Sequence, residues 1–251
     1  MNAAALKLRN PPIVEAVVDI DCESPPGFDL TALEGPARER FRDRYPKFNK
    51  RFLHELEIEQ KAEAPLKLSA RQAVQALQFL HDDERQLVQV RAQGFSFNRL
   101  APYSSLDDYL PEIKRTWQLY VEMATPVETR NVGLRYINRI LLPMEAGKVE
   151  LDEFLKLGPR LADEEALELT GFLIQHAAVE KDTGHQVNLV LTSQAPENEK
   201  LPVILDIGVT KPLRVEPGDW PAVRQTVDSL RRLKNRIFQD MLTDKCLQLF
   251  R

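Results

Sequence analysis

Cysteine and histidine are scarce in this sequence. Cys22 and Cys246 are the only cysteines among 251 residues. Small disulfide-stabilised secreted domains carry many more, so a disulfide scaffold is excluded and both thiols are expected to be reduced. The four histidines show no metal-ligand spacing. We therefore expect neither a metal nor a cofactor.

Long apolar runs and an excess of one charge sign are also missing. No stretch of about eighteen apolar residues occurs, and residues 1–10 contain no apolar segment like that of a secretory signal. We therefore expect a cytoplasmic protein with no membrane association. The net charge is -4, from 34 basic and 38 acidic residues. This balance excludes a globally basic coat for nucleic acid.

The familiar catalytic motifs are absent as well. The sequence contains no G-x-S-x-G, no phosphate-binding loop, no paired-glycine dinucleotide motif and no H-E-x-x-H. No catalytic residue is identified on this basis. An enzyme of another type is retained only as the third hypothesis for function.

Hydrophobic residues make up 43% of the chain, which is enough for a full core. Their spacing alternates between the period of a strand and that of a helix. In the first half it predicts a strand at Ile13 to Asp21, a helix with Pro36 in its first turn, strands at about Leu53 to Lys61, Ala73 to His81 and Gln86 to Leu100, and a helix from Leu106 to Ala124. In the second half it predicts a strand at Val132 to Leu142, a short helix at Leu151 to Leu157, strands at Leu169 to Val179, Gln186 to Ser193 and Pro202 to Val209, and a helix from about Trp220 to Leu242.

Each half thus has the order strand, helix, three strands, helix. Residue identity between the halves is almost nil, so a duplication is indicated by element order alone. We predict an α+β fold in which residues 1–251 form a single domain with two pseudo-repeats, at about 11–125 and about 130–245. Their first strands would join two sheets into one curved, eight-stranded antiparallel sheet covered by helices on one face. The TATA-box-binding protein has a comparable duplicated saddle, which says nothing about function.

Four strings together resemble a known family. They are Pro11-Pro12-Ile13-Val14-Glu15-Ala16, Gly94-Phe95-Ser96-Phe97-Asn98-Arg99-Leu100, Leu134-Arg135-Tyr136-Ile137-Asn138-Arg139-Ile140 and Leu242-Thr243-Asp244-Lys245. In this order they resemble a sporadically distributed, uncharacterised family of bacterial proteins of about 250 residues. Patchy distribution is typical of genes in mobile-element or defence neighbourhoods, so the resemblance implies that context. It implies no catalytic residue.

Strand alternation selects four charged residues as a candidate site. Glu15 and Asp19 share one face of the first strand, and Arg135 and Arg139 share one face of the strand that opens the second half. If these strands pair, two carboxylates and two guanidiniums meet on the uncovered face. They would form either a ligand site for an anionic group or a solvated ladder of ion pairs. Exposed pairs of the latter kind contribute only about 0–1 kcal/mol each.

The segment from Gly94 to Phe97 permits two interpretations. An aromatic-x-aromatic strand after glycine is similar to half of an RNA-recognition sheet, where exposed rings stack on bases. Gln93 replaces the usual basic residue, however, and no second aromatic strand is found. We therefore expect Phe95 and Phe97 to pack beneath a helix.

Two helical segments, Arg38 to Arg51 and Arg224 to Arg236, carry an excess of basic residues. They could contact phosphates or form ordinary solvated faces. The favoured hypothesis is a non-enzymatic protein that binds another protein. The alternative is a nucleotide- or nucleic-acid-binding protein that uses Arg135, Arg139 and the basic helices. Oligomerisation is left open.

Overall fold

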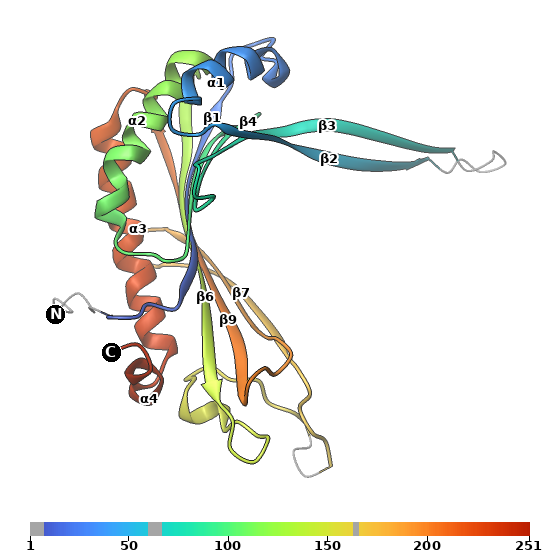
Figure 1. The fold of residues 1–251 in the computed structure, drawn as a ribbon, viewed down its shortest axis with the longest axis vertical. Helices are drawn as coiled ribbons and strands as arrows, with labels where there is room; N and C mark the ends of the chain where they lie inside the picture. Colours follow the sequence, from blue (N-terminus) through green and yellow to red (C-terminus); the bar gives the residue numbers. More distant parts are fainter. Residues whose placement is uncertain (1–7, 60–66, 163–165) are drawn as a thin grey trace.

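One open antiparallel sheet of nine strands organises the chain, in the order β2-β3-β4-β5-β1-β6-β9-β8-β7 (Figure 1). The computed structural model describes residues 8–59, 67–162 and 166–251. The strands are β1 (Ile13–Glu23), β2 (Lys47–Glu59), β3 (Lys67–Leu80), β4 (Gln86–Arg91), β5 (Gly94–Leu100), β6 (Glu128–Pro143), β7 (Leu173–Val179), β8 (Gln186–Ser193) and β9 (Lys200–Val215).

The helices lie on one side of this sheet (Figure 1). They are α1 (Glu34–Phe41), α2 (Leu106–Ala124), α3 (Trp220–Met241) and α4 (Asp244–Gln248), with 3-10 turns at Leu30–Leu33 and Leu151–Glu153. The predicted α+β class with an antiparallel sheet is confirmed. Among the described residues, no helix combines the length and apolar character needed to cross a bilayer.

The first strands of the two halves pair at the centre of the sheet, as predicted. β1 runs antiparallel to β6, with Glu15 opposite Ile137, Val17 opposite Arg135 and Asp19 opposite Gly133. Each first strand also pairs with the last strand of its own half, β1 with β5 and β6 with β9. The two halves are therefore joined through one continuous hydrogen-bonded ladder.

The predicted strand count and the strict repeat of element order are wrong. The segment expected as one strand, Gln86 to Leu100, is a hairpin that turns at Ala92-Gln93, where Gly94 has a φ of +141°. The strand expected at Leu53 to Lys61 is the longer β2, and residues 60 and 61 lie outside the described residues. The helix expected at Leu151 to Leu157 is only a 3-10 turn, because Gly158-Pro159 leaves too short a segment to propagate a helix.

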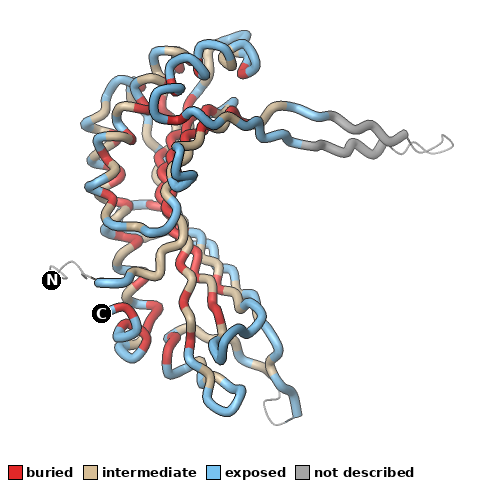
Figure 2. Tube along the Cα trace, viewed as in Figure 1, coloured by how far each residue is buried: buried red, intermediate tan, exposed pale blue. Residues whose placement is uncertain are grey.

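The core lies between the sheet and the two long helices (Figure 2). Ser105 caps α2 by accepting a hydrogen bond from the backbone of Asp107. Phe95 and Phe97 are buried, and the Phe95 ring lies 5.8 Å from that of Trp117. The expectation that these aromatic residues pack beneath a helix is confirmed, so they offer no stacking platform for bases.

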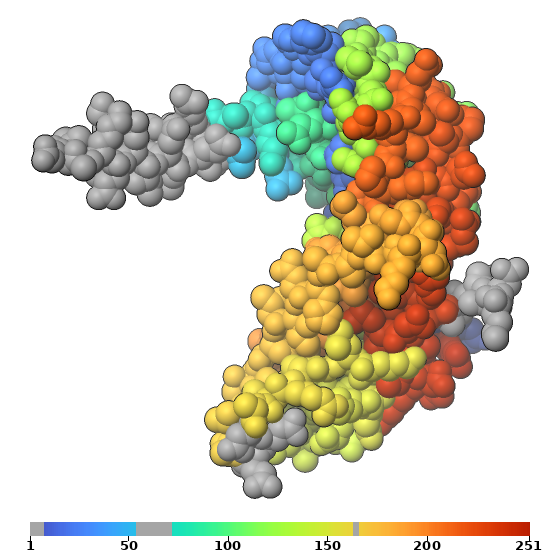
Figure 3. All heavy atoms as spheres, turned by 180° about the vertical axis from the view of Figure 1, so that it is seen from behind, coloured from blue at the N-terminus to red at the C-terminus, as the bar shows by residue number. Residues whose placement is uncertain are grey.

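The sheet curves toward its uncovered side. At one end, β2 and β3 project away from the body of the molecule beyond the point where β4 stops pairing with β3, at Ala76 (Figure 1). At the other end, β6, β9 and β7 lean toward the same side. Seen from behind, the molecule is hollowed between the part drawn in blue and cyan and the part drawn in yellow and gold (Figure 3). We call the concave side of the sheet, turned away from the helices, the open face.

Candidate functional site

The four predicted site residues all lie on the open face. In β1, Ala16, Val18 and Ile20 point into the core, so Glu15 and Asp19 point to the other side. The register between β1 and β6 places Arg135 beside Val17, on that same side. Arg139 follows Arg135 at strand spacing and shares its face. The predicted placement is therefore correct.

The predicted network between the two acids and the two arginines does not form. Arg135 pairs with Asp206 of β9 instead. Arg135 Nε donates to Oδ1 at 2.9 Å, and Nη2 donates to Oδ2 at 2.5 Å. Arg139 pairs with Glu197 at 2.8 Å and donates to Gln194 at 3.0 Å, both in the loop before β9. β6 lies between β1 and β9, so acidic groups are within reach of the two arginines on both sides. Both arginines pair with the acidic groups on the side of β9.

The two predicted carboxylates are held by side chains of β5. Asn98 Nδ2 donates to Glu15 at 2.6 Å, and Ser96 Oγ donates to Asp19 at 2.5 Å. Both donors are buried even though no helix covers this side of the sheet. Glu15 and Asp19 therefore hold fixed positions on a polar surface.

Hydrogen bonds between side chains continue this surface across neighbouring strands. Gln78 of β3 donates to Gln89 of β4 at 3.0 Å, and Gln89 donates to Asn98 at 2.9 Å, which in turn donates to Glu15. Arg91 of β4 lies 2.8 Å from Asp21 and 3.5 Å from Asp19. Linked polar side chains thus extend from β3 to β1.

Charge in the central part of the open face is mixed and paired. Arg91, Arg135 and Arg139 each lie within ion-pair distance of a carboxylate. The hydrogen bonds to Asp206 raise the pKa of Arg135 above its ordinary value, against the opposing effect of partial burial. The central part of the face therefore presents alternating charges and amide groups.

Sequence reasoning missed several members of this surface. Gln78, Gln89 and Arg91 belong to strands whose pairing partners cannot be read from alternation alone. Asp206 did carry a signal, because it is the one acidic residue in the apolar stretch from Leu201 to Val209. A carboxylate in an apolar stretch is costly to bury unless it is paired, so a basic side chain on the neighbouring strand is its expected partner.

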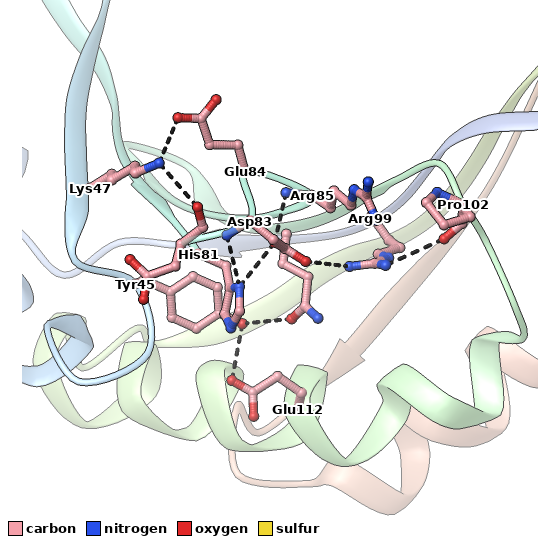
Figure 4. Close-up of polar contacts among 11 residues, drawn as sticks. Tyr45, Lys47, His81, Asp83, Glu84, Arg85, Arg99, Pro102 and Glu112 are labelled. Carbon is pink, nitrogen blue, oxygen red and sulfur yellow. Dashed lines mark hydrogen bonds and ion pairs between the residues drawn. The ribbon is translucent and has the colours of Figure 1, made fainter.

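A second polar cluster lies at the turn between β3 and β4 (Figure 4). Tyr45 Oη lies 3.0 Å from Glu112 of α2, and Asp83 accepts from the backbone N–H of Arg85 at 2.9 Å and contacts His81 Nδ1 at 2.9 Å. The backbone hydrogen bond from Arg85 is the main cause that lowers the pKa of Asp83. These contacts tie α2 and the turn to the end of α1, which is a structural role.

The expectation that Arg38 to Arg51 is helical is only partly correct, because α1 ends at Phe41 and Lys47, Lys50 and Arg51 lie in β2. The basic residues around α1 and in α3 do not join Arg135 and Arg139 in one patch. Arg40 and Arg44 lie on the helix side of the sheet and pair with Glu122 and Glu112 of α2. Arg224 and Arg231 of α3 both pair with Asp107. The sheet separates α1, α2 and α3 from the open face (Figure 1).

No metal-binding cluster stands out either. Across residues 8–59, 67–162 and 166–251, no three histidine, cysteine, aspartate or glutamate side chains gather as a metal ion would require. Cys22 and Cys246 are buried and free. No protein-family model matches the chain, and no curated protein is significantly similar to it.

Proposed function

We propose that this chain is a binding protein whose open face holds another protein. The observation that supports this proposal best is the concave, uncovered side of the sheet, lined by fixed polar side chains of both charge signs. A surface of paired charges and oriented amides suits another folded protein, which offers donors, acceptors and charges of both signs. Glu15, Asp19, Arg135 and Arg139 lie in its central region.

The pairing of Arg91, Arg135 and Arg139 with carboxylates favours a protein partner over nucleic acid. Phosphates bind to basic groups that release counterions, and a carboxylate already paired with each arginine repels them. The basic helices would have to act from the other side of the sheet, where acidic residues neutralise them. Nucleic-acid binding therefore remains the second candidate, supported only by the basic segments of the sequence.

A retention experiment separates the two candidates. The purified chain is applied to heparin and to duplex DNA at low salt and eluted with a salt gradient. The protein-binding proposal predicts weak retention that Arg135→Ala and Arg139→Ala leave unchanged. Strong, salt-dependent retention lost in these variants would replace the proposal with nucleic-acid binding.

A further inference from the structure

β7 forms one edge of the sheet, and no other strand in the part of the chain that the structure describes pairs with its outer side. It pairs with β8 alone, from Leu173 opposite Thr192 to Val179 opposite Gln186. Every residue of β7 is exposed except Ile174, which is half-buried. The strand is the outermost one in Figure 1, and the gold stretch that contains it lies on the surface in Figure 3. Its outer backbone groups are therefore available for pairing.

β7 also lacks the features that normally protect an edge strand. Natural edges carry charged residues, proline or a bulge, which prevent another strand from adding. The opposite edge, β2, has Lys50 and Arg51 and a register shift between Arg51 and Phe52. β7 reads Leu-Ile-Gln-His-Ala-Ala-Val, contains no Lys, Arg, Asp, Glu or Pro, and pairs without a shift.

The backbone groups that point outward can be assigned from the bonds at the two ends of the strand. Phe172 O accepts from Ser193 N at 3.2 Å, and Glu180 N donates to His185 O at 2.8 Å. Backbone direction alternates along an antiparallel strand, so the even-numbered residues face β8. The groups of Leu173, Gln175, Ala177 and Val179 therefore point away from the sheet.

We propose that β7 pairs antiparallel with β7 of a second copy of this chain, about a two-fold axis at His176. This register uses every outward backbone group of the strand, because Leu173 then faces Val179 of the partner subunit and Gln175 faces Ala177 of the partner subunit. Leu173 and Val179 are 70% and 62% exposed, the two largest fractions among the exposed large apolar side chains of the described residues. They lie at opposite ends of one face, which is the placement that makes a strand complementary to itself.

This self-pairing goes beyond the proposed function, because it uses the backbone at the edge of the sheet and not the central residues of the open face. The interface is isologous, so each residue pair occurs twice. It would continue the sheet of one copy into that of the other. A single strand pair buries little area compared with a stable interface of about 1,200–2,000 Å², so the dimer is expected to be weak and to depend on concentration.

Sedimentation of the full chain tests the proposal over a range of about 1 to 500 µM, because weak interfaces of this size dissociate at low concentration. The wild-type chain is expected to shift from monomer to dimer. Ala177→Pro removes an outward N–H that β8 does not use and is expected to abolish the dimer while the protein stays folded. Val127→Lys, at an exposed apolar residue outside β7, is the control and should leave the dimer unchanged.

Two charge variants test the register itself. Leu173→Lys and Val179→Glu should each weaken the dimer at least about fivefold, because each places a charge against an apolar side chain. An equimolar mixture of the two should restore it, because Lys then faces Glu at one end and Val faces Leu at the other. A wild-type chain that stays monomeric overturns the proposal. So does a dimer that survives Ala177→Pro, or a mixture that fails to restore pairing.

Discussion

Arg135 and Asp206 form the most complete polar contact on the open face. The guanidinium meets both carboxylate oxygens, and Asp206 is buried although it lies on an uncovered side of the sheet. A buried carboxylate that loses its partner pays the cost of its desolvation, whereas an exposed one is solvated by water. The two arginines of the candidate site therefore differ in their contribution to stability.

Arg135→Ala is expected to lower the free energy of unfolding by about 1–2 kcal/mol, a moderate loss because the arginine side chain is itself half exposed. Arg139→Ala should cost less than about 1 kcal/mol, because Glu197 is exposed. Urea unfolding of the two variants measures both values. Equal and negligible losses would show that Asp206 does not need Arg135.

Lys234 of α3 gives the protein a pH dependence. Its side chain is buried with its Nζ 3.8 Å from the centre of the Tyr136 ring, beneath the 2.7 Å contact between the Tyr103 and Tyr136 hydroxyls. Burial, with a smaller effect of the Arg231 charge, lowers the pKa of Lys234 to about 7. The unfolded chain keeps the ordinary pKa of a lysine, so it binds more protons than the folded chain above pH 7.

The free energy of unfolding should therefore rise with pH above pH 7. A single titrating group limits the rise to about 1.4 kcal/mol per pH unit, and the Tyr136 ring, which stabilises the ammonium of Lys234, reduces it further. This rise can be measured up to about pH 8.5, where the cysteines of the unfolded chain begin to ionise. Burial raises the pKa of Cys22 and of Cys246 to about 12 in the folded chain, so their ionisation at higher pH favours the unfolded chain. Denaturant midpoints at pH 7 and about 8.5 measure the rise. Lys234→Met should remove it, and an unchanged slope in that variant would assign it to another group.

At the scale of elements, the two long helices could be predicted closely and the strands only in part. The apolar stripe predicts α3 at Trp220 to Leu242, and the helix ends one residue earlier. Helix periodicity is local, so it survives without knowledge of neighbours. Strand limits depend on which strand pairs where, so the pattern alone merges β4 and β5 into one element. α4 spans only five residues, too few to show a helical period.

Leu230 tests the packing of α3 on the sheet. It is fully buried in the middle of the helix. Leu230→Ala should cost about 2–5 kcal/mol, which combines lost transfer free energy with the cavity left behind. Thermal or urea unfolding measures the loss. A cost below about 1 kcal/mol would mean that the helix does not pack through this residue.

Gly94 tests the hairpin that sequence reasoning missed. A Cβ at this position would collide with the carbonyl oxygen of Ile20 and lie 2.9 Å from the Cα of Asp21, and the φ of +141° is strained for any other residue. Gly94→Ala should therefore cost more than about 2 kcal/mol. Gly35→Ala is the matched control, because nothing lies within 4 Å of its added Cβ, and it should stay neutral or stabilise α1 slightly. Similar effects of the two changes in urea unfolding would contradict this geometry.

At the scale of the whole molecule, the open face of the sheet is the feature on which the proposed function rests. Alternation predicted which residues of β1 and β6 face it, and the join between the halves predicted that these strands pair. Alternation could not predict the partners of those residues, because they come from β5, β9 and the loop before β9, which are distant in sequence; Asp206 alone carried a signal. The concave shape likewise depends on the twist and length of strands that the pattern does not encode.

Capture of the natural partner by two double variants tests the central claim most directly. The open-face variant Arg135→Ala, Arg139→Ala and the helix-side variant Arg40→Ala, Arg44→Ala each lose two ion-paired arginines. Each folded variant and the wild-type chain are purified from the native cells, and stoichiometric partners are quantified by mass spectrometry. The account predicts a protein partner that the open-face variant loses at least about tenfold and the helix-side variant retains. A partner that follows the helix-side arginines, or that binds all three chains equally, would contradict it.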